Sequence, residues 1–152
     1  MNRPVAFVAL AALLVSCHPS RGGHAAAGAI AVTHAVIPAS PSTSEASAFL
    51  VINNDGGAPV DFTGALTPAA DSVLLHRLVR GVMQPATPLE IAAHGYVNLV
   101  PGGYHLMLEG LRRPLAVGDT VTLALRFGSG LTVSVRVPVL SYTDAVSELP
   151  LR

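Results

Sequence analysis

The sequence is poor in thiols: its 152 residues contain a single cysteine, Cys17, which lies close to the N-terminus. One cysteine cannot form an internal disulfide, and zinc sites built from several cysteines are excluded. If Cys17 is acylated, the mature chain has no free thiol. A blue-copper site, which needs a thiolate ligand, is then excluded as well.

Charge is also scarce, since charged residues make up 12% of the chain, the formal net charge is zero and no basic cluster is present. Nothing in this charge pattern points to nucleic acid or to an acidic partner. Hydrophobic residues, by contrast, make up 51% of the chain. Length and composition therefore indicate one globular domain with a real core, preceded by a short leader.

A long hydrophobic run is missing too. The apolar stretch at residues 5–15 is too short to cross a bilayer, because a spanning helix needs roughly 20 residues. It follows Arg3 and ends at Leu14-Val15-Ser16-Cys17, which resembles a bacterial lipobox. We expect residues 1–16 to be a lipoprotein signal peptide and Cys17 to carry a lipid anchor. The alternative is an ordinary signal peptide with an incidental cysteine.

No amphipathic helix longer than two turns is evident, and short alternating segments dominate instead. The clearest is residues 119–127, in which Val121, Leu123, Leu125 and Phe127 share one face. A turn at residues 128–130 leads to a second alternating segment, so the pattern predicts a β-hairpin with one buried face. Further strands are expected at residues 46–53, 60–66, 72–79, 89–91, 96–100 and 104–108.

Many short strands at close spacing favour an all-β antiparallel sandwich or barrel. We expect the folded domain to span residues 31–139. Residues 17–30 are small and polar without a period, which predicts a flexible tether. Residues 140–152 are expected to form a loosely ordered tail.

Methionine is rare, and its placement is informative. Apart from Met1, the chain has only Met83 and Met107, in the order His76, six residues, Met83, twenty-one residues, His105, Leu106, Met107. Strand alternation puts His105 and Met107 on one face, with Tyr104, Leu106 and Leu108 on the core face. The first two side chains should then point outward together, with their bases roughly 6–7 Å apart. Met83 lies between Gly81 and Pro85, which predicts a loop.

Two imidazoles and two thioethers form a soft ligand set, which favours Cu(I). Thioethers need no deprotonation, and neutral imidazole competes with protons only near its ordinary pKa of about 6.5. A site without thiolate should hold Cu(I) firmly yet release it to a better ligand set, which suits delivery. The candidate metal ligands are His76, Met83, His105 and Met107.

The segment from His76 to Met107 resembles the periplasmic copper chaperone family called PCu(A)C, whose motif is His, about ten residues, Met, twenty-one residues, His-x-Met. The stretch Pro101-Gly102-Gly103-Tyr104-His105-Leu106-Met107-Leu108 is similar to its most recognisable part. The resemblance implies a cupredoxin-like Greek-key β-sandwich that binds Cu(I) and passes it on, typically toward the copper centre of a respiratory oxidase. Two departures stand out: the first spacing is six residues, and Arg77 and Leu78 occupy positions where relatives often have a methionine.

The resemblance also implies an extracytoplasmic location, periplasmic or in the cell envelope, and a copper-acceptor protein as partner, either an oxidase subunit or another copper chaperone. We expect a monomer that is not an enzyme, since no nucleophile elbow, dinucleotide fingerprint or P-loop is present. His94 before Gly95 is expected in a turn, whereas His34 could approach the site from a neighbouring strand. The alternative function is a lipid-anchored β-sandwich that serves as an assembly module and has lost copper binding.

Overall fold

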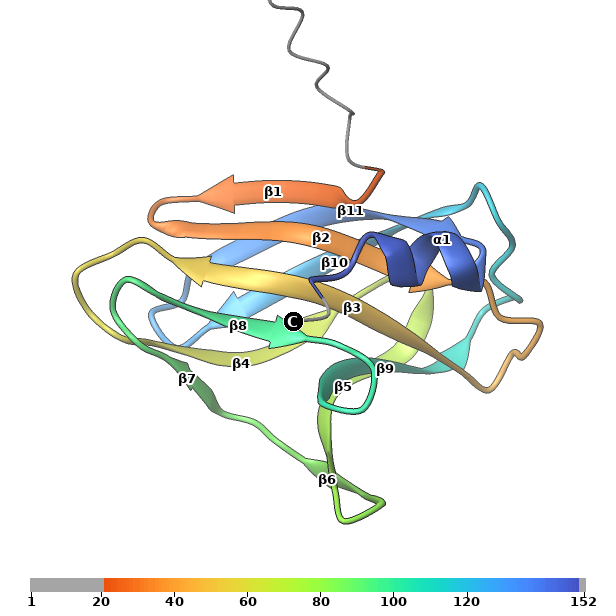
Figure 1. The fold of residues 1–152 in the computed structure, drawn as a ribbon, viewed down its shortest axis with the longest axis horizontal. Helices are drawn as coiled ribbons and strands as arrows, with labels where there is room; N and C mark the ends of the chain where they lie inside the picture. The colour runs from red at the N-terminus through yellow and green to blue at the C-terminus, as the bar shows by residue number, and fades with distance from the viewer. Residues whose placement is uncertain (1–20, 151–152) are drawn as a thin grey trace, which may run out of the picture.

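The computed structural model describes residues 21–150, so the predicted signal peptide and Cys17 lie outside the described residues. The described part is a β-sandwich of eleven strands with one short helix (Figure 1). No helix within it is long and apolar enough to span a bilayer. The strands are β1 (Gly23–Ala27), β2 (Ile30–Pro38), β3 (Glu45–Asn54), β4 (Val60–Leu66), β5 (Ala70–Val79), β6 (Val82–Pro85), β7 (Leu89–Ile91), β8 (Gly95–Leu99), β9 (Tyr104–Leu111), β10 (Thr120–Phe127) and β11 (Thr132–Leu140), and the helix is α1 (Tyr142–Ser147).

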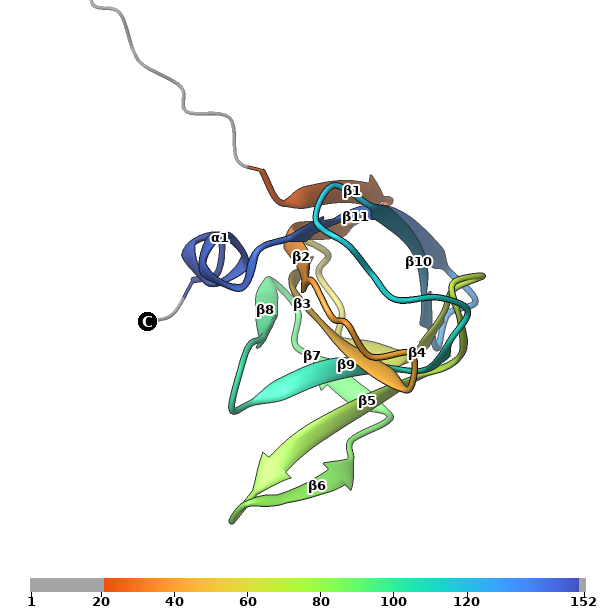
Figure 2. The ribbon, with the colours of Figure 1, turned by 90° about the vertical axis from the view of Figure 1, so that its right-hand side faces the viewer.

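The strands join in the order β6-β5-β9-β8-β3-β2-β11-β10-β4-β7, with β1 added beside β2. Seen end-on, this sheet curls around one core (Figure 2). The predicted all-β sandwich is confirmed. Most pairings are antiparallel, but β2 runs parallel to β11, and β8 touches β9 in a parallel register. Strands β2 and β11 lie near opposite ends of the chain, so they meet only after nearly the whole domain has intervened.

Strict alternation builds the core where it is most regular. On β10, Val121, Leu123, Leu125 and Phe127 are buried, and they face a matching buried row on β11. The predicted hairpin is confirmed, with Leu123 paired to Val135. Each buried aliphatic or aromatic side chain contributes about 1.5–3 kcal/mol to folding through removal of apolar surface from water. This hairpin is therefore one wall of the core.

The predicted tether is partly a strand. Within residues 17–30, β1 pairs with β2 over Ala25 to Ala27 and, after a shift in register, at Gly23. A Cβ atom at Gly23 would collide with the backbone carbonyl of Arg136, so glycine permits the close approach of β1 to β11. The prediction of a fully flexible tether was wrong for these residues, because small side chains hide the alternation that marks a strand.

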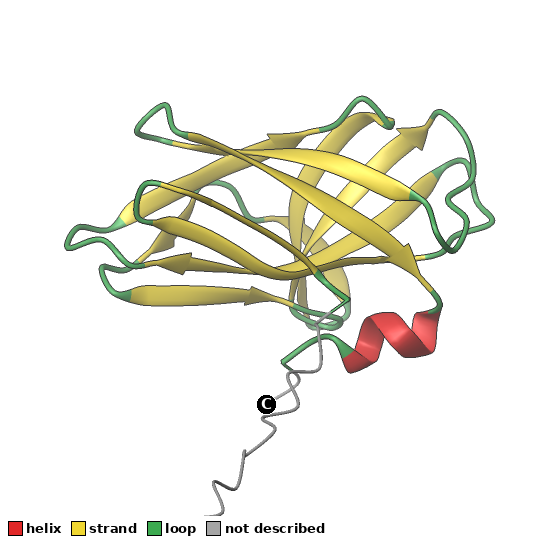
Figure 3. Cartoon of the chain, turned by 90° about the horizontal axis from the view of Figure 1, so that it is seen from above, coloured by secondary structure: helices red, strands yellow, loops and turns green. Residues whose placement is uncertain are grey.

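The predicted loose tail contains α1, which lies against the outside of the strands (Figure 3). The Ser141 hydroxyl accepts a hydrogen bond from the backbone N–H of Asp144 at 3.1 Å, which satisfies one of the free donors at the helix start. Ala145 and Leu149 then pack on Val36 and Phe49. The prediction failed here because a single capped turn and a half is too short to show helical periodicity.

Strands β5 and β6 form a hairpin arm that projects from the body of the sandwich (Figures 1 and 2). Its two-residue turn holds Arg80 and Gly81 at φ values of 51° and 79°. Positive φ at both central positions is the type I′ geometry that matches strand twist. Met83, expected in a loop, lies instead on β6, because this tight turn keeps the chain in register with β5.

Candidate metal centre

The register between β5 and β9 places His76 directly opposite His105. Side chains that face each other across an antiparallel pair lie on the same face of the sheet. The two imidazole rings are 6.2 Å apart between centroids, at an interplanar angle of 76°. Met107 pairs with Leu74, one step along the same face. Strand pairing thus brings together three of the four predicted ligands: His76, His105 and Met107.

These side chains lie on the face expected from alternation, but they are not exposed. Leu106 and Leu108 belong to the main core, whereas His105 and Met107 lie on the other side of β9. Yet His105 is only 5% exposed and Met107 only 8%. The expected outward orientation was wrong in this respect, because other side chains cover this face. Tyr104 packs against the main core, as predicted.

Two ring nitrogens at this centre are buried without a hydrogen-bond partner among the described residues: Nδ1 of His76 and Nε2 of His105. The other nitrogen of His105, Nδ1, lies 3.1 Å from the carbonyl oxygen of Gly103. A carbonyl only accepts, so Nδ1 carries the proton and the lone pair of the ring is on Nε2. A buried polar atom left unpaired costs about 1–3 kcal/mol, which calls for an explanation. Metal coordination is one that fits imidazole lone pairs.

Met83 is set apart from the other three predicted ligands. It pairs with Leu78 on the same face as His76, and its side chain is 47% exposed. Met107 is level with Leu74 on β5, and Met83 is level with Leu78, so the two methionines flank the histidine pair on opposite sides. As diagonal neighbours, Met83 and His76 have bases roughly 7–8 Å apart. A long thioether side chain can span a diagonal separation of this size, so Met83 is within reach of an ion held at His76.

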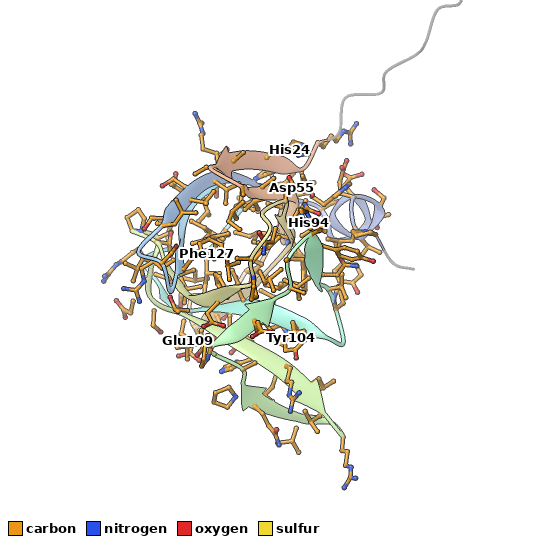
Figure 4. All side chains as sticks on the ribbon, turned by 90° about the vertical axis from the view of Figure 1, so that its left-hand side faces the viewer. His24, Asp55, His94, Tyr104, Glu109 and Phe127 are labelled. Atoms are coloured by element: carbon orange, nitrogen blue, oxygen red, sulfur yellow. The ribbon has the colours of Figure 1, made fainter. Side chains whose placement is uncertain are left out.

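The remaining histidines lie elsewhere. The Nδ1 atom of His34 is 2.8 Å from the backbone carbonyl oxygen of Glu148, and its ring packs edge-on against His24. His94 lies in a turn at a φ of 53°, as predicted. Figure 4 shows His24 and His94 far from Tyr104, at the start of β9 beside the candidate centre. Within residues 21–150, no three His, Cys, Asp or Glu side chains cluster as a metal site, so thioethers are needed to complete one.

Sequence reasoning missed Phe49 on β3 as a neighbour of the centre. Its ring centroid lies 6.5 Å from that of His105, and its side chain is buried. A hollow of about 270 Å³ lies beside it, lined among others by Ser47, Met107 and Tyr142. The alternation of β3 places Phe49 on the side of the sheet away from the main core. No local pattern could show which strand would lie beside it.

Exposed side chains around the histidine pair are apolar. Leu74, Leu78 and Met83 share its face and are each more than two-fifths exposed. Arg77 and Arg80 are the charged residues of the arm, and no carboxylate occurs between Asp71 and Glu90. The exposed side chains next to the histidine pair are therefore mainly apolar, since Arg77 lies on the opposite face of β5 from His76.

The family described as "Putative lipoprotein LpqE-like" matches residues 30–139 of the chain. The relative "Putative lipoprotein Lxx21020" of Leifsonia xyli subsp. xyli is 38% identical over an alignment of 104 residues, and the alignment covers 65% of this chain. The match spans 63% of that relative's own length.

Solved structures show the same fold. The solution structure of CuI-DR1885 from Deinococcus radiodurans is 34% identical, with a TM-score of 0.61 over 71% of this chain and 76% of that one. Apo-DR1885 is 30% identical, with a TM-score of 0.59 over 95% of this chain and 99% of that one. The copper-bound PCuAC domain from PmoF2 is 21% identical, with a TM-score of 0.67 over 78% of this chain and 97% of that one. The predicted resemblance to PCu(A)C domains is thus confirmed for the fold.

Proposed function

Because its family match covers residues 30–139, the chain belongs to the LpqE-like lipoprotein family, and we propose that it is a metallochaperone that binds Cu(I) and delivers it by ligand exchange. One observation carries the proposal: two buried imidazole nitrogens without partners lie on the same face as the Met107 thioether. A relative of the same fold, 34% identical, is a CuI-bound protein.

The donor set selects the metal. Thioether sulfur is a soft ligand that favours Cu(I), whereas Mg²⁺ and Ca²⁺ prefer oxygen ligands and structural zinc sites use Cys and His. Nε2 of His105 and Nδ1 of His76 supply two nitrogen donors, and Met107 supplies sulfur. Met83 is the fourth proposed ligand, and it joins from the exposed side of the centre.

Ligand exchange follows from the uneven burial of this set. His105 and Met107 are enclosed, whereas Met83 is exposed at the arm. An acceptor's donor atoms therefore approach from the side of Met83 and replace it first. The exposed apolar side chains Leu74 and Leu78 offer a surface for such an acceptor. A respiratory oxidase subunit or another copper chaperone is the proposed recipient, and the chain is proposed to act as a monomer.

Anchoring at Cys17 would hold the domain close to a membrane of the cell envelope. The family description as a lipoprotein supports acylation there. Strand β1 begins at Gly23, so the segment from Cys17 spans at most about 20 Å when fully extended. Mass spectrometry of the mature protein tests this: a lipid mass on Cys17 is expected, and an unmodified thiol contradicts anchoring.

Cu(I) titration against a competing chelator tests the function. The chain is purified with Cys17→Ser, so that no thiol contributes to binding. One tightly bound equivalent is expected, weakened by His105→Ala and by Met107→Ala but not by the control His94→Ala in its turn. If the parent protein binds no better than a His76→Ala/His105→Ala double variant, copper binding is refuted. The alternative of an envelope assembly module without copper then remains.

A further inference from the structure

His105 is the most enclosed nitrogen ligand of the proposed centre, and two rings flank it. Strand β9 lies between β5 and β3, so His76 flanks His105 from one side and Phe49 from the other. The centroid separations are 6.2 Å and 6.5 Å, with interplanar angles of 76° and 54°. The imidazole thus has little room to rotate.

Phe49 is held from outside by α1. It belongs to a small buried cluster, separate from the main core, that contains Val36, Phe49, Ala145 and Leu149. Ala145 is a residue of α1 and Leu149 follows it, so the C-terminal helix forms the outer layer over Phe49. Within the described residues, this cluster is the packing layer next to the metal centre on the side of β3.

The helix is in turn fastened to the first described residues. The backbone N–H of Arg21 donates to Glu148 Oε1 at 3.1 Å, and the Arg21 guanidinium lies 3.6 Å from Asp144. Nδ1 of His34 donates to the Glu148 carbonyl at 2.8 Å. The two ends of the domain therefore meet at α1, and continuous contacts run from Arg21 through α1 and Phe49 to His105.

We propose that Phe49, backed by α1, is a positioning residue for the copper centre: it keeps the His105 ring in the orientation in which Nδ1 donates to Gly103 and Nε2 is free for the metal. The inference rests on the proposed function for its role toward copper. The physical reason is that one hydrogen bond fixes a single ring atom, and a turned imidazole would leave Nδ1 unpaired or point Nε2 away from His76. Phe49 and His76 flank the ring from opposite sides and limit its tilt, which keeps Nδ1 within hydrogen-bond distance of the Gly103 carbonyl. Hydrogen-bonded neighbours that orient a metal-ligating histidine typically affect metal affinity by about 10–100-fold, and we expect a packing neighbour to act at the lower end of this range.

The test compares Phe49→Leu with a matched control, Phe127→Leu. Phe127 is also buried and also contacts a second ring, Phe62 at 5.7 Å, but it lies on β10 away from both histidines. Two quantities are measured: Cu(I) affinity, and the ¹⁵N chemical shifts that report the tautomer of His105 in the copper-free protein. Phe49→Leu should weaken Cu(I) binding about tenfold and mix the tautomers. Phe127→Leu should leave the tautomer unchanged and the affinity within about twofold.

Equal behaviour of the two variants in both measurements overturns the inference. The tautomer shifts need no copper, so they decide the positioning role even if the parent protein fails to bind Cu(I), a result that would refute only the proposed function. If Phe49→Leu does not fold, Leu149→Ala is tested in its place. That change keeps the phenylalanine but removes the Leu149 side chain that packs in the same cluster. Leu149→Ala should shift the tautomer ratio in the same direction. An unchanged ratio in a folded Leu149→Ala protein also overturns the inference.

Discussion

The β10–β11 hairpin and the β5–β6 hairpin use the same kind of local structure for different ends. The first pairs at seven positions and buries one complete face in the core. The second pairs at four, and all four residues of β6 are exposed. Burial stabilises a strand, whereas exposed backbone pairs with few apolar contacts open easily. The comparison teaches that the stable hairpin holds the fold, while the marginal one is free to carry an exposed thioether beside the candidate metal centre.

The largest expected difference is in stability. Leu123→Ala on β10 removes a fully buried side chain, which should lower the free energy of unfolding by about 2–5 kcal/mol. Leu78→Ala on β5 truncates a side chain that is 43% exposed, and it should cost about 0.5 kcal/mol or less. Urea denaturation measures both. Similar losses would mean that the arm is part of the core.

The second expected effect is a difference in Cu(I) affinity between variants of the buried proposed ligand His105 and of the exposed proposed ligand Met83. His105→Ala removes a buried donor and should lower Cu(I) affinity by about a hundredfold or more, since even outer neighbours cost about 10–100-fold. Met83→Ala should cost tenfold at most, because this side chain stands at the exposed margin. Competition titrations give both affinities. Equal losses would show that Met83 contributes as much to metal binding as His105.

The third expected effect uses the two turns as a matched pair. Gly130 and Gly81 have φ values of 83° and 79°, and a Cβ atom added at either position would meet no other atom. Alanine there is strained by about 1–2 kcal/mol through its backbone conformation alone. Gly130→Ala should lower global stability by that amount. Gly81→Ala should leave the urea midpoint nearly unchanged, because the arm opens locally, while amide hydrogen exchange in β6 becomes faster. A global loss at Gly81 would contradict this.

The smallest expected effect depends on pH. The Arg113 guanidinium, 2.7 Å from the Asp119 carboxylate, and the Ala116 N–H hold the pKa of Asp119 below its ordinary value. A lowered folded-state pKa stabilises the fold above the unfolded-state pKa, and this stabilisation is lost as pH falls through the folded-state value. The free energy of unfolding of Asp119→Asn should therefore fall slightly less than that of the parent protein as the pH is lowered. Urea midpoints from pH 7 down to about 2 check this, and unchanged acid sensitivity would contradict it.

Most of the fold could be predicted because alternation is a local property. Strands were expected at residues 60–66 and 89–91, and β4 and β7 have these bounds. The failures have a shared cause. β1 consists mostly of small residues, and α1 has only six residues, so neither leaves a periodic signal. Both become ordered only when they pack on strands that are distant in the chain.

The candidate site divides in the same way. The shared face of His105 and Met107 follows from a spacing of two residues, and the structure agrees. Their burial does not follow from spacing, since it depends on Phe49 and α1. The spacing of six residues between His76 and Met83 predicted a short loop. In the structure, the type I′ turn places Met83 on strand β6, where it pairs with Leu78.

The sequence by itself determined the soft donor set, the absence of a thiolate ligand within the folded domain, and the face on which His105 and Met107 lie, because composition and alternation depend on neighbouring residues alone. Only the tertiary structure decided that His76 stands opposite His105, that Phe49 lies beside His105, and that Met83 is exposed at the margin. Register between distant strands is set by the packing of the whole core, which no local pattern contains.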